Sequence, residues 1–416
     1  ALRAMGVEIR LLVSDRDWDR LRVSLRFADA IVDGVLGTGA HGELRKPVLR
    51  LVEEINTAGK PVMAIDIPSG VEADTGRVAS LAVHANRTLA LGLPKVGHLL
   101  GQGANATGEL LVDDIGIPHD LLAGEELRQS LITRESAAKL LPMRRRDVHK
   151  GSCGRILVLA GSLGMTGAAA LAAEAALRIG AGVVTLGVPE KLYPVLAAKL
   201  TEVMVVPVPD EGAGCFGGAK SLETTLALAE KADAVLIGPG IGRTVQTGEF
   251  VRFFAADVKA PLVMDADAIA AFQNHLDALR DLPQVPILTP HLGEFARLLG
   301  KDVEAVQEDL LHTARDAARE HQAVFALKSA CTIVVYPDGD AFFTTVGNAG
   351  MATAGAGDVL AGTIVGLMRQ MESGMTPIVG VYAHGRAGDL AYAQNGNGLV
   401  AGDILKLLPE ALKELG

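Results

Sequence analysis

The chain has 416 residues, of which 49% are hydrophobic and 21% are charged, and this composition is typical of a globular protein rather than a disordered one. Its net charge of −10 and its aromatic content of 4% disfavour a protein that binds nucleic acid through phosphate contacts and base stacking. The three cysteines are far apart and no apolar run reaches the ~18 residues of a membrane span, so we expect neither a disulfide framework nor a membrane protein. The first residues, Ala-Leu-Arg-Ala-Met, show no signal-peptide pattern, so we expect a cytoplasmic location and a chain that begins within a longer protein.

Short apolar runs and one helical pattern alternate over the first part of the chain. Strands are expected at residues 28–32, 61–67 and 87–91. A helix is expected at residues 44–57. This alternation predicts a parallel α/β domain over residues 1–120, and residues 121–150 are interpreted as a linker and leading segment.

The remaining residues, 151–416, show the same alternation and predict a second α/β domain. A strand at 155–160 is followed by the turn Gly161-Ser162 and an Ala-rich helix at 166–179. Further strands are expected at residues 234–238, 261–265, 286–289 and 324–327, with a hairpin at 332–336 and 340–346 and helices from residue 356. This pattern favours a mostly parallel sheet covered on both faces, with ligands outside the carboxyl ends of its strands.

The strongest local signal is the segment 354–360, Ala-Gly-Ala-Gly-Asp-Val-Leu, which leads into an expected helix. Gly355 and Gly357 allow the backbone to approach an anion closely, and the start of the helix presents unpaired N–H groups and a positive dipole end. Asp358 is then either a helix cap or a base beside a phosphate, and the pattern by itself leaves both interpretations open.

Several other segments at strand ends fit the same pocket. Lys328 and Thr332 supply a cation and a hydroxyl donor for a phosphate. Three turns follow strands, namely Gly238-Pro239-Gly240-Ile241-Gly242, Thr289-Pro290-His291-Leu292-Gly293-Glu294, and Gly161-Ser162 with Gly167-Ala168. Each turn also has a structural interpretation, as a tight turn, a structural histidine or a close packing of helix on sheet.

In the first domain, two carboxylates stand where apolar strands end. Asp33 closes one strand, and Asp66 precedes Pro68-Ser69-Gly70 at the end of another. Such a pair could bind a cation or transfer a proton, or both residues could cap turns. The loop 37–42 also has the Gly-x-Gly-x-x-Gly pattern after a strand, whereas Walker A, His-Glu-x-x-His and Gly-x-Ser-x-Gly motifs are absent.

Taken in order, these motifs resemble a known pair of families. His149-Lys150-Gly151-Ser152-Cys153-Gly154-Arg155, Gly161-Ser162, Gly238–Gly242, Asp265-Ala266-Asp267-Ala268, Thr289-Pro290-His291, Lys328–Thr332 and Gly355–Asp358 are similar to the ADP-dependent NAD(P)H-hydrate dehydratases, which have the ribokinase-like fold. Asp33 with Gly37-Thr38-Gly39, Asp66–Gly70, Gly92-Leu93-Pro94-Lys95 and Asp114–Pro118 resemble the Rossmann-like NAD(P)H-hydrate epimerase domain that precedes it in many bacterial fusions.

The resemblance implies ADP-dependent removal of water from the S hydrate of NADH or NADPH, a metabolite-repair reaction that gives AMP and phosphate. It implies catalytic roles for Asp358 as base and for Gly355, Ala356 and Gly357 at the transferring phosphoryl group. It implies nucleotide binding by Lys328, Ser329, Ala330, Cys331, Thr332, Asn348 and Gly357, and hydrate binding by Ala168, Gly240, Gly242, His291 and Asp358. In the first domain it implies epimerase substrate positions at Gly37, Thr38, Gly39 and Asp66, and a potassium site at Asp33 and Ser69. The implied cofactors are ADP, with ATP as the alternative donor, Mg²⁺ and K⁺, and the implied assembly is a homotetramer that binds small molecules, not nucleic acid or membrane.

Two departures from the family pattern bear on activity. Ser329 replaces a family glycine, which weakens nucleotide binding if that position requires a glycine-only conformation. The epimerase loop Asn-Asn-Gly-Gly-Asp-Gly is absent from the chain as given, so we expect it to dehydrate the S hydrate without interconverting R and S, while the longer parent does both. The alternatives are a ribokinase-like small-molecule kinase and a non-catalytic nucleotide-binding module.

Overall fold

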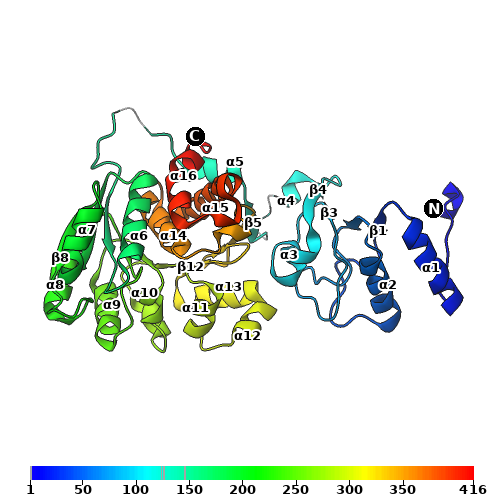
Figure 1. Ribbon diagram of the computed structural model, residues 1–416, viewed down its shortest axis with the longest axis horizontal. Coiled ribbons are helices and arrows are strands. Elements are labelled where there is room, and N and C mark those ends of the chain that lie inside the picture. The colour runs from blue at the N-terminus through cyan, green and yellow to red at the C-terminus, as the bar shows by residue number, and fades with distance from the viewer. Residues whose placement is uncertain (1, 123, 125–126, 145–146) are drawn as a thin grey trace. The chain divides into compact units, whose positions relative to one another are not determined.

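The computed structural model describes residues 2–122, 124, 127–144 and 147–416. The chain divides into two compact units, Ala1–Gly124 and Glu125–Gly416, and each is described by itself (Figure 1).

The first unit is built on a four-stranded parallel sheet in the order β1-β2-β3-β4. Its strands are β1 (Ile31–Asp33), β2 (Val62–Ile65), β3 (Arg87–Leu91) and β4 (Glu109–Asp113). Its helices are η1 (Leu2–Met5), α1 (Asp15–Phe27), α2 (Lys46–Thr57), η2 (Val96–His98), α3 (Gly101–Thr107) and α4 (His119–Leu122). Val52 and Ile55 of α2 pack against Ile31 and Val62 of the sheet, which makes the core of this unit. Strand β4 was not expected from the sequence, because it lies at the sheet edge and its residues are mostly exposed.

The second unit contains a ten-stranded sheet in the order β5-β14-β13-β12-β11-β10-β9-β6-β7-β8. The strands are β5 (Gln129–Ile132), β6 (Arg155–Leu159), β7 (Val183–Pro189), β8 (Met204–Val208), β9 (Ala234–Ile237), β10 (Leu262–Met264), β11 (Ile287–Leu288), β12 (Val324–Leu327), β13 (Ile333–Val335) and β14 (Ala341–Thr344). Strand β13 runs antiparallel to β12 and β14, as the expected hairpin requires, and the other pairings are parallel. The predicted α/β class with a mostly parallel sheet is therefore confirmed.

Helices cover both faces of this sheet (Figure 1). They are α5 (Arg134–Leu140), α6 (Thr166–Arg178), η3 (Glu190–Leu192), α7 (Tyr193–Lys199), α8 (Gly218–Ala229), α9 (Val245–Asp257), α10 (Asp267–Ala270), η4 (Leu276–Asp281), α11 (Leu292–Leu298), α12 (Val303–Glu308), α13 (Leu310–His321), η5 (Ala349–Met351), α14 (Ala356–Leu367), η6 (Ser373–Met375), α15 (Thr376–Asn395), η7 (Gly396–Gly398) and α16 (Ala401–Lys413). The chain steps from β6 to β7 in one direction and from β9 to β10 in the other. Because parallel crossovers are right-handed, α6 and α9 lie on opposite faces.

The structure adds three strands to those expected in this part of the chain. Strands β7 and β8 were not expected from the sequence. The Ala-rich helix α6 and strand β7 form one apolar run in the sequence. In the structure, Gly180, in the left-handed region at φ 114°, separates α6 from β7. Strand β5 and helix α5 lie within the segment interpreted as linker and leading segment, and β5 pairs with β14. Residues 123, 125–126 and 145–146 of that segment lie outside the described part of the chain.

Helices α6 and α14 pack backbone to backbone in the core. A Cβ atom at Gly362 would lie 2.2 Å from the carbonyl oxygen of Ala172, and one at Gly366 would lie 2.7 Å from that of Ala176. Only small residues allow this approach, which accounts for the alanines of α6. The packing holds the first turn of α14, and with it residues 355–358, in a fixed place above the sheet.

Candidate active site

The start of α14, residues 355–358, forms a turn with the backbone geometry expected of an anion site, and it is called the anion corner below. Gly355 is the N-cap residue, in the left-handed conformation at φ 92°, and Ala356 and Gly357 follow in the first turn. Asp358 is the third helical residue, and its carboxylate makes no hydrogen bond with any residue that the structure describes. The helix-cap interpretation of Asp358 therefore has no support, because Gly355 occupies the cap position.

The electrostatic environment of Asp358 suits a proton acceptor. Burial and the nearby Asp265 carboxylate raise its pKa to about 7; Lys328 acts in the opposite direction, and Asp267 and Glu294 add to the rise. A carboxyl group with a pKa near the working pH is about half ionised there, and its ionised form binds a proton readily, which is what general-base catalysis requires.

Lys328 follows the carboxyl end of β12 and lies beside this corner. Its Nζ is 2.8 Å from Oδ1 of Asp265 and 4.0 Å from Oε2 of Glu294. A Cβ atom at Gly357 would come within 3.1 Å of the same Nζ, so the glycine leaves room for the ammonium group. Burial by itself lowers the pKa of Lys328, but the surrounding carboxylates outweigh it and the pKa is raised. The site thus holds a fixed positive charge next to the start of α14, where the N–H groups of Gly355 and Gly357 have no partner among the described residues and that of Ala356 donates to the Thr353 carbonyl at 3.4 Å.

His291 joins the same cluster through its backbone. It forms an isolated parallel bridge with Lys328, and it is the N-cap residue of α11. Its Nδ1 accepts hydrogen bonds from the N–H groups of Gly293 and Glu294 at 3.1 and 3.3 Å, which is the structural role anticipated for a histidine at a helix start. Its Nε2 lies 3.5 Å from Oε1 of Glu294 on a side chain that is 53% exposed, so this nitrogen remains accessible to a ligand.

The glycine turn after β9 lies against the start of α6. A Cβ atom at Gly240 would be 2.8 Å from Cβ of Met165 and 3.2 Å from Cβ of Ala168, so no side chain fits between the turn and the helix. The Ser162 hydroxyl donates to the Gly240 carbonyl at 2.9 Å, and the Gly242 N–H donates to Asp267 at 3.0 Å. Ala168, Gly240 and Gly242 are therefore brought together at the carboxyl ends of β6 and β9.

In the segment 328–332, three of the side chains are bound within the protein: Lys328 pairs with Asp265, as described above, and two others form hydrogen bonds. The Ser329 hydroxyl donates to the Cys331 carbonyl at 2.5 Å, and the Cys331 thiol, whose pKa burial raises to about 12, donates to the Thr344 carbonyl at 3.1 Å. A nucleotide would meet the main chain here, the Lys328 ammonium group or the side chain of Thr332. Ser329 is not in the left-handed conformation, so its replacement of a family glycine introduces no backbone strain.

Asn348 is held by a residue that the sequence analysis missed. Asp389, on α15, accepts from the Asn348 amide at 2.9 Å and from the Gly347 N–H at 3.2 Å. Two glycines of α15 allow the close approach: a Cβ at Gly385 would lie 2.8 Å from Val346, and one at Gly388 would lie 2.1 Å from Met351. The sequence contains a signal for this contact: two glycines inside a long helix, followed by an aspartate, indicate that another segment packs closely there. That segment is the loop 346–351.

His384, on the same helix, lies under the anion corner. Burial lowers its pKa to about 4, so the imidazole is neutral, and it interacts with the backbone of Ala356. Its Nε2 is buried and finds no hydrogen-bond partner among the described residues.

In the first unit, the predicted positions form two separate groups. The Ser69 hydroxyl and N–H donate to the two carboxylate oxygens of Asp33 at 2.7 and 2.8 Å, and both residues are buried. Asp66, at φ 66°, forms an ion pair with Lys95. Burial alone raises the pKa of Asp66, but the hydrogen bonds from Lys95 and from the Leu91 N–H outweigh it and lower that pKa. Lys95 was noted in the sequence but was not assigned a role.

The glycine loop of the first unit is open to solvent. Gly37, Thr38 and Gly39 are exposed, and a Cβ at either glycine would meet no atom within 4 Å. Packing within the chain therefore does not explain these glycines.

Comparison with known proteins agrees with this architecture. The family profile described as NAD(P)H-hydrate dehydratase matches residues 156–410, and the profile described as YjeF-related protein N-terminus matches residues 1–97. The structure of a Bacillus subtilis ADP/ATP-dependent NAD(P)H-hydrate dehydratase, co-crystallised with ATP and Mg²⁺, is 30% identical with a TM-score of 0.60 and covers 69% of this chain and 99% of that one. A ribokinase-like protein of Enterococcus faecalis, 26% identical, has a TM-score of 0.60 and covers 70% of this chain and 97% of that one. The second unit is thus a ribokinase-like enzyme domain of the NAD(P)H-hydrate dehydratase class.

Relatives that match along both units are bifunctional NAD(P)H-hydrate repair enzymes. The enzyme of Moorella thermoacetica is 41% identical over 99% of this chain and 78% of its own length, and that of Thermofilum pendens is 36% identical over the same shares. The chain belongs to this family. In the described residues, no helix is long and apolar enough to cross a membrane.

Proposed function

We propose that the second unit dehydrates the S hydrate of NADH or NADPH with ADP as phosphoryl donor. The observation that carries this is a carboxyl group with a pKa near 7, Asp358, placed at a helix start beside the charged Lys328. A kinase-like corner of this kind suits transfer of a phosphoryl group to a hydroxyl.

The reaction has two steps. The hydroxyl oxygen on C6 of the hydrate attacks the terminal phosphorus of ADP; the new O–P bond forms as the bond to the bridging oxygen breaks, AMP leaves, and Asp358 takes the hydroxyl proton. The ring nitrogen then expels phosphate from C6, and loss of a proton from the neighbouring ring carbon restores the dihydropyridine. Phosphorylation is needed because hydroxide is a poor leaving group and phosphate is a good one.

Each group around the corner has a role in this scheme. The N–H groups of Gly355, Ala356 and Gly357 stabilise charge on the transferring phosphoryl group, and Lys328 neutralises a phosphate oxygen. We assign the nucleotide to segment 328–332 with Asn348. The hydrate is assigned to Ala168, Gly240, Gly242 and His291; the positions of these residues after β6, β9 and β11, at the carboxyl edge of one sheet, support this assignment.

Two metal ions belong to the proposal as well. Among the described residues, no group of three or more His, Cys, Asp or Glu side chains is arranged to hold a metal, so we propose that Mg²⁺ is held mainly by the nucleotide phosphates, where it would neutralise charge. In the first unit, Oδ2 of Asp33 accepts a single hydrogen bond, from Ser69 N–H, and so retains a lone pair for K⁺. Asp33 and Ser69 fit a potassium ion as part of a larger oxygen set. The Asp66–Lys95 pair is our candidate for the epimerase chemistry of this unit.

The test is turnover of purified (S)-NADPH hydrate with ADP, followed by the absorbance of reduced nicotinamide and by the release of AMP and phosphate. Recovery of NADPH with equal amounts of AMP and phosphate supports the proposal. A stable phosphorylated product without NADPH would favour the kinase alternative, and ADP binding without any turnover would favour the binding module.

A further inference from the structure

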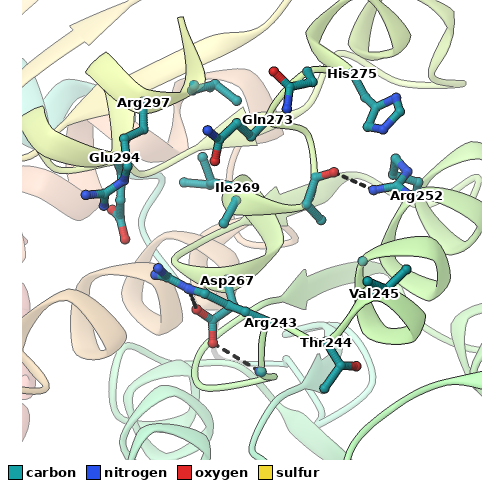
Figure 2. Close-up of a pocket in the computed structure, with 16 residues that line it drawn as sticks. Arg243, Thr244, Val245, Arg252, Asp267, Ile269, Gln273, His275, Glu294 and Arg297 are labelled. Carbon is teal, nitrogen blue, oxygen red and sulfur yellow. Dashed lines mark hydrogen bonds and ion pairs between the residues drawn. The ribbon is translucent and has the colours of Figure 1, made fainter. Parts of the chain in front are cut away.

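A cavity of about 450 Å³ opens beside the candidate active site, at the carboxyl ends of β9 to β11 (Figure 2). One end is lined by Gly242 and Asp267, which the site already includes. From there the cavity continues between α9, α10 and α11, and three arginines line it: Arg243, Arg252 and Arg297. In Figure 2, Arg297 and Arg252 lie on opposite sides of the cavity, and Arg243 lies below them beside Asp267.

The positive charge of this cavity is only partly neutralised. Arg243 pairs with Asp267 at 2.5 Å, and these two charges offset each other. Arg252 donates to a neutral group, the Ala271 carbonyl, at 2.7 Å, and it forms no ion pair with a carboxylate of the described residues. The guanidinium of Arg297 makes no hydrogen bond or ion pair with any residue that the structure describes.

The second carboxylate of the lining does not cancel these charges. Glu294 is 8% exposed; it accepts from the N–H of His291 at 3.0 Å and lies 4.0 Å from Lys328, so its charge is shared with the catalytic cluster. Two cations in an open cavity are unusual in a chain whose net charge is −10. They indicate a binding site for an anion, and guanidinium groups match the geometry of phosphate oxygens.

We propose that this cavity binds the phosphate-bearing part of the hydrated dinucleotide, through Arg297 and Arg252. The inference rests on the function proposed above, because it takes the hydrate to reach Asp358 with its ring. The nicotinamide ring then lies at the anion corner, and the rest of the dinucleotide passes Gly242. The phosphates of the dinucleotide therefore lie in the part of the cavity beyond Gly242. The ADP donor is assigned to the opposite side of Lys328, at segment 328–332.

Arg297 and Arg252 are each replaced by Gln, which removes the charge and keeps much of the side chain. Initial rates are measured with the S hydrates of NADPH and of NADH at saturating ADP. We expect the KM for hydrate to rise about tenfold or more in Arg297→Gln, the size of a lost charged hydrogen bond, with a much smaller change in kcat and in the KM for ADP. Arg297→Lys restores part of the affinity, because a lysine supplies charge without the fork of donors.

The two hydrates distinguish the phosphate that is bound. A rise for both hydrates assigns the pyrophosphate, which both contain; a rise for the NADPH hydrate alone assigns the 2′-phosphate. A titration of NADPH by the fluorescence of its reduced nicotinamide measures affinity without turnover, and its Kd should rise in parallel. The matched control is Arg319→Gln on α13, an exposed arginine that lines no part of this cavity and should leave every constant unchanged.

Unchanged KM and Kd in both Gln variants, with an active wild-type chain, would overturn this inference and leave the proposed function standing. An equal rise in Arg319→Gln would also overturn it, because the effect would then reflect net charge alone. An inactive wild-type chain would instead refute the proposed function.

Discussion

Replacing Asp358 with Asn tests the proposed base most directly, because it removes a proton acceptor and preserves the shape of the side chain. The fold should tolerate it: Gly355 is the helix cap, and the Asp358 carboxylate makes no hydrogen bond within the described residues. A general base typically contributes about 10²–10⁴-fold in rate, so we expect kcat for dehydration to fall by that factor. Affinity for ADP should change little, because Lys328 and segment 328–332 are intact.

The pH dependence gives a second readout of the same group. Burial and the surrounding carboxylates raise the pKa of Asp358 to about 7, and only the ionised form accepts a proton. The wild-type rate should therefore rise with pH through about 7 and level off above it. The residual activity of Asp358→Asn should lack this step.

The raised pKa also has a consequence for stability. The pKa of Asp358 is higher in the folded than in the unfolded chain, so its ionisation destabilises the fold, increasingly as pH rises toward 7. Asp358→Asn should thus match the wild type near pH 4 and unfold at a higher temperature at pH 8. The difference is a few kcal/mol at most, since each pKa unit corresponds to about 1.4 kcal/mol.

The assay is S-hydrate dehydration by both proteins from pH 5.5 to 8.5, with ADP affinity measured on the same samples and thermal unfolding measured from pH 4 to pH 8. A rate loss below about tenfold, small against the range for a general base, would place the base elsewhere. A variant with low activity and a lowered melting temperature at pH 8 would contradict the environment described for this carboxyl group.

Three further substitutions test other contacts. Lys328→Met leaves Asp265 buried without its cation, so we expect the free energy of unfolding to fall by about 3–5 kcal/mol and the KM for ADP to rise; unchanged denaturant unfolding would contradict the ion pair. Asp389→Ala removes the hydrogen bonds that hold loop 346–351 on α15, and it should raise the KM for ADP about tenfold with less effect on kcat. Asp389→Asn should restore part of the affinity for ADP. An effect on kcat alone would argue against this positioning role. Gly238→Ala places a Cβ 2.0 Å from the Asp265 carbonyl oxygen, at a residue whose φ is 126°, and should lower the free energy of unfolding by about 3 kcal/mol or more. The control is Gly402→Ala, where a Cβ meets no atom within 4 Å, and it should leave stability unchanged. Equal melting temperatures of the two variants would refute the close approach.

Local pattern was enough to predict the fold class and most of the strands. Strand β3 begins and ends where the sequence indicated, and the Ala-rich helix and the β13–β14 hairpin were both expected. These elements have a clear period and are bounded by glycine or turn residues, which are properties of neighbouring residues. Strands β4, β7 and β8 lack those properties, because β4 is an exposed edge and β7 follows an apolar helix with only a glycine turn between them.

The motifs likewise identified the family, because their order along the chain is specific even though each is short. The sequence by itself therefore determined the class of enzyme and the segments that meet at the strand ends. It did not settle whether Asp358 caps a helix or accepts a proton.

Only the tertiary structure decided how these segments act on one another. The pKa of Asp358 depends on Asp265 and Lys328, which come from different strand ends, and on the burial of the first turn of α14 within the fold. The same holds for Asp389, which reaches a loop 41 residues away in the chain, and for the arginines of the cavity, which come from separate helices. Charge, burial and hydrogen bonding act through space, so residues remote in sequence set them, and no local pattern contains that information.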